Sequence, residues 1–160
     1  MLLHPHRTYP SPLDVTADEL RWMGVRALLL DIDGTIAQTR DPAPSPDIVR
    51  WAEGLQQAGI TLFILSNNRH PQRVRLFGEK LHCGFIHLAR KPARRGFLQA
   101  LAQIGCPAGQ AALLGDQIFT DVLGARRCGL RALRVESIDD YLWYFRLRRF
   151  FEKPFVQPKE

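Results

Sequence analysis

Cysteine is scarce in this chain, and long hydrophobic runs are missing. The three cysteines, Cys83, Cys106 and Cys128, are widely spaced and form no C-x-x-C pair. This argues against a disulfide framework or a zinc site and fits a reducing compartment. No apolar run approaches the roughly 18 residues that a membrane-spanning helix needs. Because the chain does not open with a basic segment followed by an apolar one, we expect no signal peptide and a cytoplasmic protein.

The 160 residues also lack internal repeats, and 46% of them are hydrophobic and 24% charged, as in ordinary globular proteins. We expect a single domain over residues 1–153, large enough for a full core. It would include a lead with a short helix over 1–24 and an aromatic, basic helix over 138–153, before a tail over 154–160. The net charge of +6 favours an anionic partner: nucleic acid, an acidic lipid surface or a phosphorylated substrate.

Apolar runs and helix signals alternate along the chain. Runs that predict buried strands lie at 26–31, 60–65, 85–88, 111–114 and 130–135. Predicted helices lie between them at 46–59, 71–81, 92–104 and 120–128. Thr16 and Glu19 form a candidate capping box, Ser45 is a candidate N-cap, and Pro46 and Pro92 stand at predicted helix starts. The alternation predicts a three-layer, Rossmann-like α/β fold with a parallel sheet of about five strands flanked by helices.

Two aspartates stand two residues apart at the end of the first predicted strand. Asp31 and Asp33 follow an apolar run and precede Gly34 and Thr35. Open α/β sheets bind ligands outside the carboxyl ends of their strands. Two acids held close together there repel each other unless a cation, a proton or a reaction uses them. We therefore treat this motif as the start of a candidate site.

Polar residues follow three further predicted strands. They are Ser66, Asn67 and Asn68 after the second, Lys91 after the third, and Gly115, Asp116 and Asp121 after the fourth. Each group alone also has a structural explanation, as a loop, a helix start or a helix cap. Because the carboxyl ends of parallel strands share one edge of the sheet, all four groups together indicate a single site.

The order of these groups resembles the haloacid dehalogenase-like (HAD) phosphohydrolases. The D-x-D-G-T run at Asp31, then Ser66, Lys91 and the G-D-x4-D run at Asp116 and Asp121 match the four motifs of that superfamily. Within it, the segments L-S-N-N, A-R-K-P and G-D-Q-I-F-T-D-V and the short proline-containing lead resemble the YqeG-like phosphatases of subfamily IIIA. The resemblance covers roughly residues 10–150.

The resemblance and the chemistry of the residues imply a role for each acid. Asp31 would attack phosphorus and form an aspartyl-phosphate, while Asp33 would transfer protons. Asp116, with Asp31 and the backbone carbonyl of Asp33, would hold Mg²⁺. Asp121 would hold a water on that metal or Lys91, and Lys91 would offset the charge on phosphate.

Smaller residues complete the predicted site. Ser66 and Asn67 would donate hydrogen bonds to phosphate oxygens. Gly34 would allow close approach of the backbone, and Thr35 would support the turn at the second aspartate. Gly34 is also a departure, because YqeG-like sequences usually have Asn at this position.

The spacing between motifs leaves little room for a cap domain. Only 24 residues separate Thr35 from Ile60, enough for a loop and one helix. An open site suits substrates held on a larger body, although an oligomer could also supply a lid. Arg69, Arg73 and Arg75 would either line the phosphate entrance or form an exposed helix face.

The segment 141–151 is rich in aromatic residues and arginine, which suits a membrane interface; packing on the domain or in a dimer explains it equally well. Relatives of this subfamily include phosphatases that convert phosphatidylglycerophosphate to phosphatidylglycerol. The leading hypothesis is therefore a Mg²⁺-dependent phosphatase of a lipid-linked phosphomonoester, in peripheral contact with the inner membrane face. The alternatives are a soluble sugar-phosphate or nucleotide phosphatase closed by oligomerisation, and a non-catalytic HAD-fold binding protein. No specific nucleic-acid module is recognisable.

Overall fold

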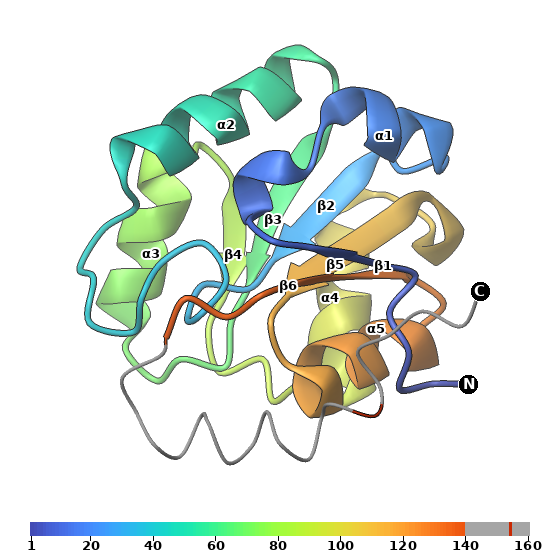
Figure 1. Cartoon of the computed structure of the whole chain (residues 1–160). Helices are drawn as coiled ribbons and strands as arrows, with labels where there is room; N and C mark the ends of the chain where they lie inside the picture. The colour runs from blue at the N-terminus through green and yellow to red at the C-terminus, as the bar shows by residue number, and fades with distance from the viewer. Residues whose placement is uncertain (140–153, 155–160) are drawn as a thin grey trace.

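The computed structural model describes residues 1–139 and Pro154 (Figure 1). The helix predicted over 138–153 lies outside the described residues apart from its first two positions, and so does the whole segment 141–151. None of the described helices is both long and apolar enough to span a bilayer.

A parallel sheet forms the centre of the molecule, as predicted. Its strand order is β1-β6-β5-β2-β3-β4, and every neighbouring pair is parallel. The strands are β1 (Arg7–Tyr9), β2 (Ala27–Leu30), β3 (Thr61–Leu65), β4 (Gly84–Ile86), β5 (Ala111–Gly115) and β6 (Arg131–Val135). Five of them correspond to the predicted strands. The sixth, β1, pairs with β6 at the edge of the sheet and was missed because three residues show no periodicity.

Helices cover both faces of the sheet (Figure 1). They are α1 (Ala17–Trp22), α2 (Pro46–Gln57), α3 (Pro71–Lys80), α4 (Arg94–Ile104) and α5 (Leu123–Arg127). In β2, Leu28 and Leu30 pack in the core beneath α1, α2 and α3, whereas Leu29 packs in the core with α4 and α5. This alternation follows from the two-residue period of a strand. Because both faces are covered, β2 is apolar throughout, and the predicted three layers are confirmed.

Two predicted helix starts are confirmed. Ser45 Oγ accepts a hydrogen bond from the backbone N–H of Ile48 at 3.3 Å, with Pro46 as the first residue of α2. Thr16 Oγ1 caps α1 through the N–H of Glu19 at 3.3 Å. The Glu19 carboxylate, however, pairs with Arg7 at 2.8 Å instead of completing a capping box.

Two helix boundaries differ from the prediction. Pro92 does not begin α4: the helix starts at Arg94, because Lys91 and Pro92 belong to a loop at the carboxyl edge of the sheet. The helix predicted from residue 120 begins earlier, as a π-helical turn over Ile118–Val122 that leads into α5. Both differences lie beside the predicted site, where the backbone places Lys91 and Asp121 at the carboxyl edge of the sheet.

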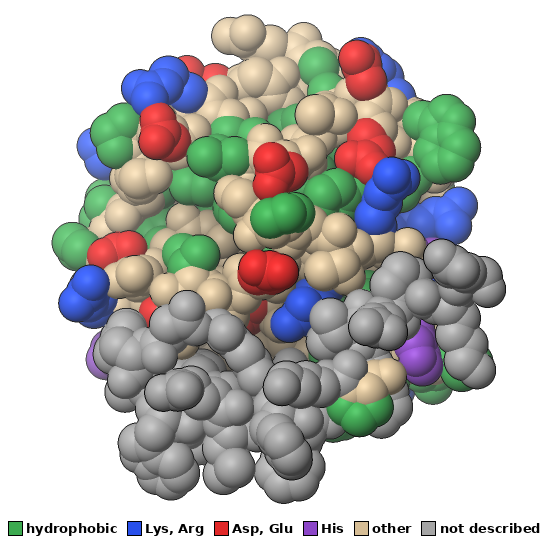
Figure 2. All heavy atoms as spheres, viewed as in Figure 1, with side chains coloured by type: hydrophobic (Ala, Val, Ile, Leu, Met, Phe, Trp, Pro, Cys, Tyr) green, Lys and Arg blue, Asp and Glu red, His purple; other side chains and the backbone are tan. Residues whose placement is uncertain are grey.

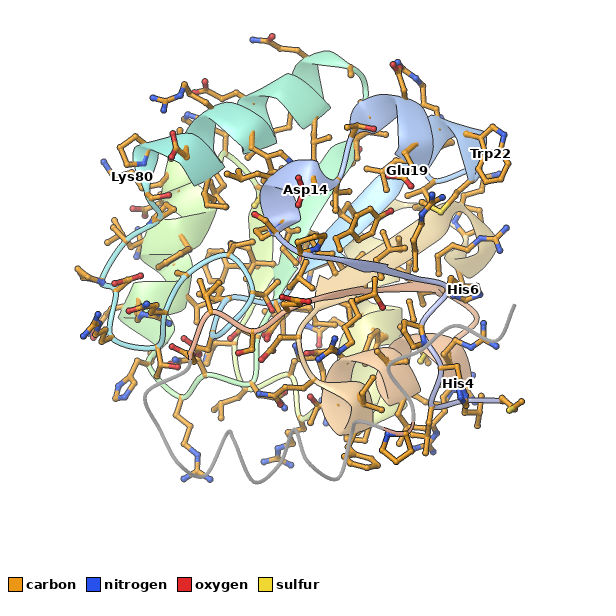
Figure 3. All side chains as sticks on the ribbon, in the orientation of Figure 1. His4, His6, Asp14, Glu19, Trp22 and Lys80 are labelled. Atoms are coloured by element: carbon orange, nitrogen blue, oxygen red, sulfur yellow. The ribbon has the colours of Figure 1, made fainter. Side chains whose placement is uncertain are left out.

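The described surface carries charges of both signs. Figure 2 shows acidic and basic side chains interspersed over the face that carries α1 and α2. Trp22, at the end of α1, is 82% exposed and projects away from the fold (Figure 3). The connection from Thr35 to β3 is a loop and α2 alone, so the carboxyl edge of the sheet carries no inserted domain there.

Candidate active site

Three carboxylates lie together at the carboxyl ends of β2 and β5. Asp31 follows β2 directly, Asp116 follows β5, and Asp121 lies in the π-helical turn. One oxygen of each lies within 4.8 Å of the others, and all three residues are buried. The structure thus brings three of the four acids predicted for the site into one cluster.

Lys91 enters this cluster from the loop after β4. Its Nζ lies 2.8 Å from Asp31 Oδ1 and 2.6 Å from Asp121 Oδ1, and its side chain is 1% exposed. Burial alone would lower the pKa of Lys91, but the carboxylates of Asp121 and Asp31 outweigh it and raise that pKa above its ordinary value. Lys91 is therefore a buried cation that bridges two acids.

The acids outnumber the cation in this cluster. Burial, helped by the charge of Asp121, raises the pKa of Asp31 to about 7 against the opposing effect of Lys91. Burial and the carboxylates of Asp121 and Asp31 raise the pKa of Asp116 well above its ordinary range. Crowded carboxylates of this kind favour a bound proton or cation. An all-oxygen donor set suits a hard divalent ion such as Mg²⁺, so these residues fit the predicted metal.

Asp33 lies at the margin of the cluster, with a side chain that is 22% exposed. Its Oδ1 accepts a hydrogen bond from Arg73 Nη1 at 2.7 Å, and its Oδ2 accepts one from Asn68 Nδ2 at 2.8 Å. Asp33 therefore differs from the three clustered acids, because a guanidinium and an amide are its direct partners.

Ser66 and Asn67 follow β3 at the same edge. Ser66 is fully buried, and its Oγ accepts the N–H of Asn68 at 3.1 Å, so its hydroxyl hydrogen can still be donated. The Asn67 side chain donates to the carbonyl of Lys91 at 3.1 Å and accepts the N–H of Lys91 at 2.8 Å. Asn67 thus holds the loop that carries Lys91, and its role as a phosphate donor stays a prediction.

Gly34 lies against Asp116, in a turn with a φ of +79°. A Cβ on Gly34 would lie 2.6 Å from Asp116 Oδ2 and 2.8 Å from Ser137 Oγ. Thr35 is fully buried, and its Oγ1 donates to Asp116 Oδ1 at 3.4 Å. Gly34 thus packs tightly against Asp116, and Thr35 hydrogen-bonds Asp116 directly. The roles of both residues toward the substrate stay predictions.

This packing predicts a strong effect of Gly34→Ala. We expect a loss of about 2–3 kcal/mol of unfolding free energy and a displaced Asp116, because the methyl group adds a clash to the backbone strain. Gly24→Ala is the matched control, since its φ is +74° and nothing lies within 4 Å of the added Cβ. We expect that control to lose only about 1 kcal/mol in urea unfolding. Equal losses in the two variants would contradict this account of Gly34.

Three site residues were missed or undervalued in the sequence. The Ser137 hydroxyl hydrogen-bonds the Asp116 carboxyl, Asn68 binds Asp33, and Arg73 contacts Asp33 as well. Ser137 follows β6, whose carboxyl end lies at the same edge, so its position after a predicted strand was an available signal. Arg73 lies on a helix, where spacing alone does not distinguish a site residue from an exposed one.

Comparison with known proteins agrees with this geometry. A family model described as haloacid dehalogenase-like hydrolase matches residues 39–129, more than half of the chain. The "Probable phosphatase YqeG" of Bacillus subtilis is 34% identical over 124 residues, which cover 78% of this chain and 72% of that protein. The chain belongs to the haloacid dehalogenase-like hydrolases. The predicted family, its YqeG-like character and the enzyme class of phosphatase are thereby confirmed.

Two further similarities are partial or distant. Human phospholysine phosphohistidine inorganic pyrophosphate phosphatase is 46% identical, but over only 34% of this chain and 21% of that protein. The Moraxella catarrhalis 3-deoxy-D-manno-octulosonate 8-phosphate phosphatase, solved with magnesium ion, phosphate ion and KDO, aligns with a TM-score of 0.58 and 16% identity. That alignment covers 72% of each chain, and it confirms the HAD-like fold.

Proposed function

We propose that this HAD phosphatase hydrolyses phosphomonoesters with the help of Mg²⁺ and through an aspartyl-phosphate on Asp31. The observation that carries the proposal is the bridge that Lys91 forms, with Nζ 2.8 Å from Asp31 Oδ1 and 2.6 Å from Asp121 Oδ1. It holds a strand-end carboxylate in one orientation beside a positive charge. That arrangement suits attack on an anionic phosphoryl group.

The first half of the reaction transfers the phosphoryl group to the enzyme. An Asp31 oxygen attacks phosphorus while the bond from phosphorus to the leaving oxygen breaks. Asp33, at the more exposed margin of the site, supplies the proton that the leaving oxygen takes up. Lys91 and the hydroxyl of Ser66 stabilise the charge on the transferred phosphoryl group.

The second half regenerates the enzyme. Asp33, now a carboxylate, takes a proton from the attacking water. Water adds to phosphorus, the bond between phosphorus and the Asp31 oxygen breaks, and inorganic phosphate leaves. Lys91 keeps the Asp31 carboxylate in place for the next cycle through its contact at 2.8 Å.

Asp31 and Asp116 are the residues that would hold Mg²⁺, with Ser137 and Thr35 orienting Asp116. Both acids have a raised pKa, which a bound cation would reverse. When bound, the ion supplies positive charge that polarises the phosphoryl group and screens its repulsion from the carboxylate nucleophile. The magnesium and phosphate named for the Moraxella catarrhalis enzyme are consistent with this assignment.

We propose that the substrate is a lipid-linked phosphomonoester of the phosphatidylglycerophosphate type, carried on a larger body. Exposed apolar side chains near the site support this proposal. Leu88, Phe119 and Ile138 are exposed by 45%, 36% and 37%. Two of them are hydrogen-bonded to residues of the site: the Leu88 N–H bonds the Asn68 carbonyl, and the Ile138 N–H bonds the Gly34 carbonyl. Phe119 lies between Asp116 and Asp121 in the sequence. Exposed apolar side chains around an open site suit a surface on which substrates are presented.

One experiment tests both the metal and the substrate. Phosphate release is measured on phosphatidylglycerophosphate in anionic vesicles, on glucose 6-phosphate and on AMP, each with Mg²⁺ or with EDTA. We expect hydrolysis with Mg²⁺, a fall of at least about 10²-fold in EDTA, and a preference for the vesicle substrate.

The outcomes separate the competing hypotheses. Activity on the soluble esters alone would replace the lipid proposal with a soluble phosphatase. Equal rates with Mg²⁺ and EDTA would contradict the metal assignment at Asp31 and Asp116. No hydrolysis of any phosphomonoester would leave a HAD-fold binding protein.

A further inference from the structure

Arg73, in the first turn of α3, contacts three separate points of the chain through one guanidinium. Its Nη1 lies 2.7 Å from Asp33 Oδ1. Its Nε donates to the carbonyl of Asp41 at 2.8 Å, and its Nη2 donates to the carbonyl of Gln38 at 3.1 Å. The side chain is 13% exposed. Arg73 thus joins Asp33 to the turn over residues 38–41, which we call the flap turn.

The ring of Phe77 fixes the orientation of this guanidinium. Its central carbon lies 5.0 Å from the centre of the Phe77 ring, and Phe77 is fully buried in the core. A planar guanidinium over an aromatic face gains a cation–π contact and keeps its fork of donors in one plane. These contacts therefore hold the Arg73 side chain in one orientation.

The flap turn is held from its other side as well. Asp139, 1% exposed, accepts hydrogen bonds from the Thr39 N–H at 2.9 Å and the Thr39 hydroxyl at 2.6 Å. The flap turn is thus tied to the chain after β6 by Asp139 and to α3 by Arg73. Of these two residues, only Arg73 also binds Asp33, the proposed acid of the reaction.

The second oxygen of Asp33 is held by Asn68 at 2.8 Å. The Asn68 Oδ1 accepts the N–H of His70 at 2.8 Å, which orients the amide so that its NH₂ group faces Asp33. Each carboxyl oxygen of Asp33 therefore has its own fixed donor. Since each oxygen has a further lone pair, Asp33 can be held in this way and still exchange a proton.

We propose that Arg73 is a positioning residue that holds Asp33 in place for proton transfer to the leaving group. The inference rests on the proposed function, in which Asp33 is the acid. A general acid works only within hydrogen-bond reach of the atom that it protonates, and small misplacements cost much of the rate. Without Arg73, Asp33 would keep one of its two fixed donors, and the flap turn beside it would lose its tie to α3.

This role predicts a defect that depends on the leaving group. A poor leaving group such as benzyl alkoxide needs protonation as its bond to phosphorus breaks, whereas 4-nitrophenolate departs without it. A residue that merely stabilises the fold would lower both rates equally. Because kcat/KM reports steps up to the departure of the leaving group, it isolates the transfer that Asp33 assists.

The experiment compares Arg73→Gln with Arg75→Gln on benzyl phosphate and 4-nitrophenyl phosphate. Arg75 is the matched control because it lies on the same helix, is 70% exposed and pairs with Glu79 at 2.8 Å. For Arg73→Gln we expect kcat/KM to fall about 10²-fold on benzyl phosphate and less than about 10-fold on 4-nitrophenyl phosphate. Arg75→Gln should leave both values unchanged. The ratio of the two values in one preparation does not depend on the folded fraction.

Three results would overturn the proposal. If kcat/KM of Arg73→Gln falls equally on both esters, Arg73 has only a structural role. If kcat/KM is unchanged on both esters, Arg73 has no role in the reaction. Arg73→Lys keeps the charge but not the three-point fork, so complete restoration of the ratio by lysine would show that charge alone suffices. If the unmodified protein hydrolyses neither ester, the proposed function itself fails; if it hydrolyses both, only the role of Arg73 is at stake.

Discussion

Asp31→Asn should abolish phosphate release while leaving a folded protein. We expect kcat on 4-nitrophenyl phosphate to fall by at least about 10³-fold, because an amide cannot form the aspartyl-phosphate. The change is small in size and keeps an oxygen for the contact with Lys91. The measurement is steady-state hydrolysis with Mg²⁺, and Mg²⁺-dependent activity retained in the variant would contradict the assignment of Asp31 as nucleophile.

The same variant should be more stable than the parent at neutral pH in EDTA. Burial raises the pKa of Asp31 from 3.8 to about 7, so between these values the folded protein binds a proton that the unfolded chain has released. Stability due to this group therefore falls as the pH rises from about 4 to about 7. Asparagine carries no charge and escapes this loss, and we expect a gain on the order of 2 kcal/mol at pH 8.

Urea unfolding at pH 5 and pH 8 tests the sign of this effect. The advantage of Asp31→Asn should be larger at pH 8, where the parent must keep a buried carboxylate. A variant that is less stable than the parent at both pH values would mean that its contact with Lys91 outweighs the cost of burial. Together the two measurements distinguish loss of chemistry from loss of fold.

The strands and the strand-end motifs could be predicted from local sequence because each has its own signal. Leu28, Leu29 and Leu30 must all be apolar when both faces of the sheet are covered. The polar residues that follow strands must then gather at one edge, so Asp31 and Asp116 could be paired although 84 residues separate them in the sequence. The family resemblance added the roles, which local patterns do not contain.

The remaining features depend on contacts between distant segments. The three residues of β1 form a strand only because β6 lies beside them. Arg73 and Arg75 are both arginines on α3, yet the side chain of Arg73 is 13% exposed and that of Arg75 is 70% exposed. The bonds from Asn67 to the Lys91 backbone likewise require the folded loop, and they explain why Pro92 does not begin α4.

Lys91→Met should be the most destabilising of the proposed variants at alkaline pH. The side chain is similar in length, but it leaves Asp31 and Asp121 buried without their cation, which typically costs about 3–5 kcal/mol. We also expect kcat to fall by about 10²-fold or more, because the charge that faces the phosphoryl group is lost. Urea unfolding in EDTA at pH 8 measures the first effect, and hydrolysis of 4-nitrophenyl phosphate measures the second.

Lys80→Met provides the control for charge removal alone. Lys80 is an exposed residue in the last turn of α3 (Figure 3), and its loss should change the unfolding free energy by less than about 0.5 kcal/mol. A similar deficit in both variants would show that net charge, and not the buried bridge, is responsible.

The pH dependence of the Lys91→Met deficit identifies its cause. Lys91 lowers the pKa of Asp31 against the larger effect of burial, so without it Asp31 binds its proton more tightly. In the variant the pKa of Asp31 therefore lies above the parent value of about 7. As the pH falls from 8, this carboxylate becomes protonated, and a neutral acid no longer needs the buried cation. The deficit should therefore shrink by at least about half between pH 8 and pH 5. A deficit of the same size at both values would instead mean that Lys91 stabilises the fold through packing, and that the charge of this cluster contributes little to stability.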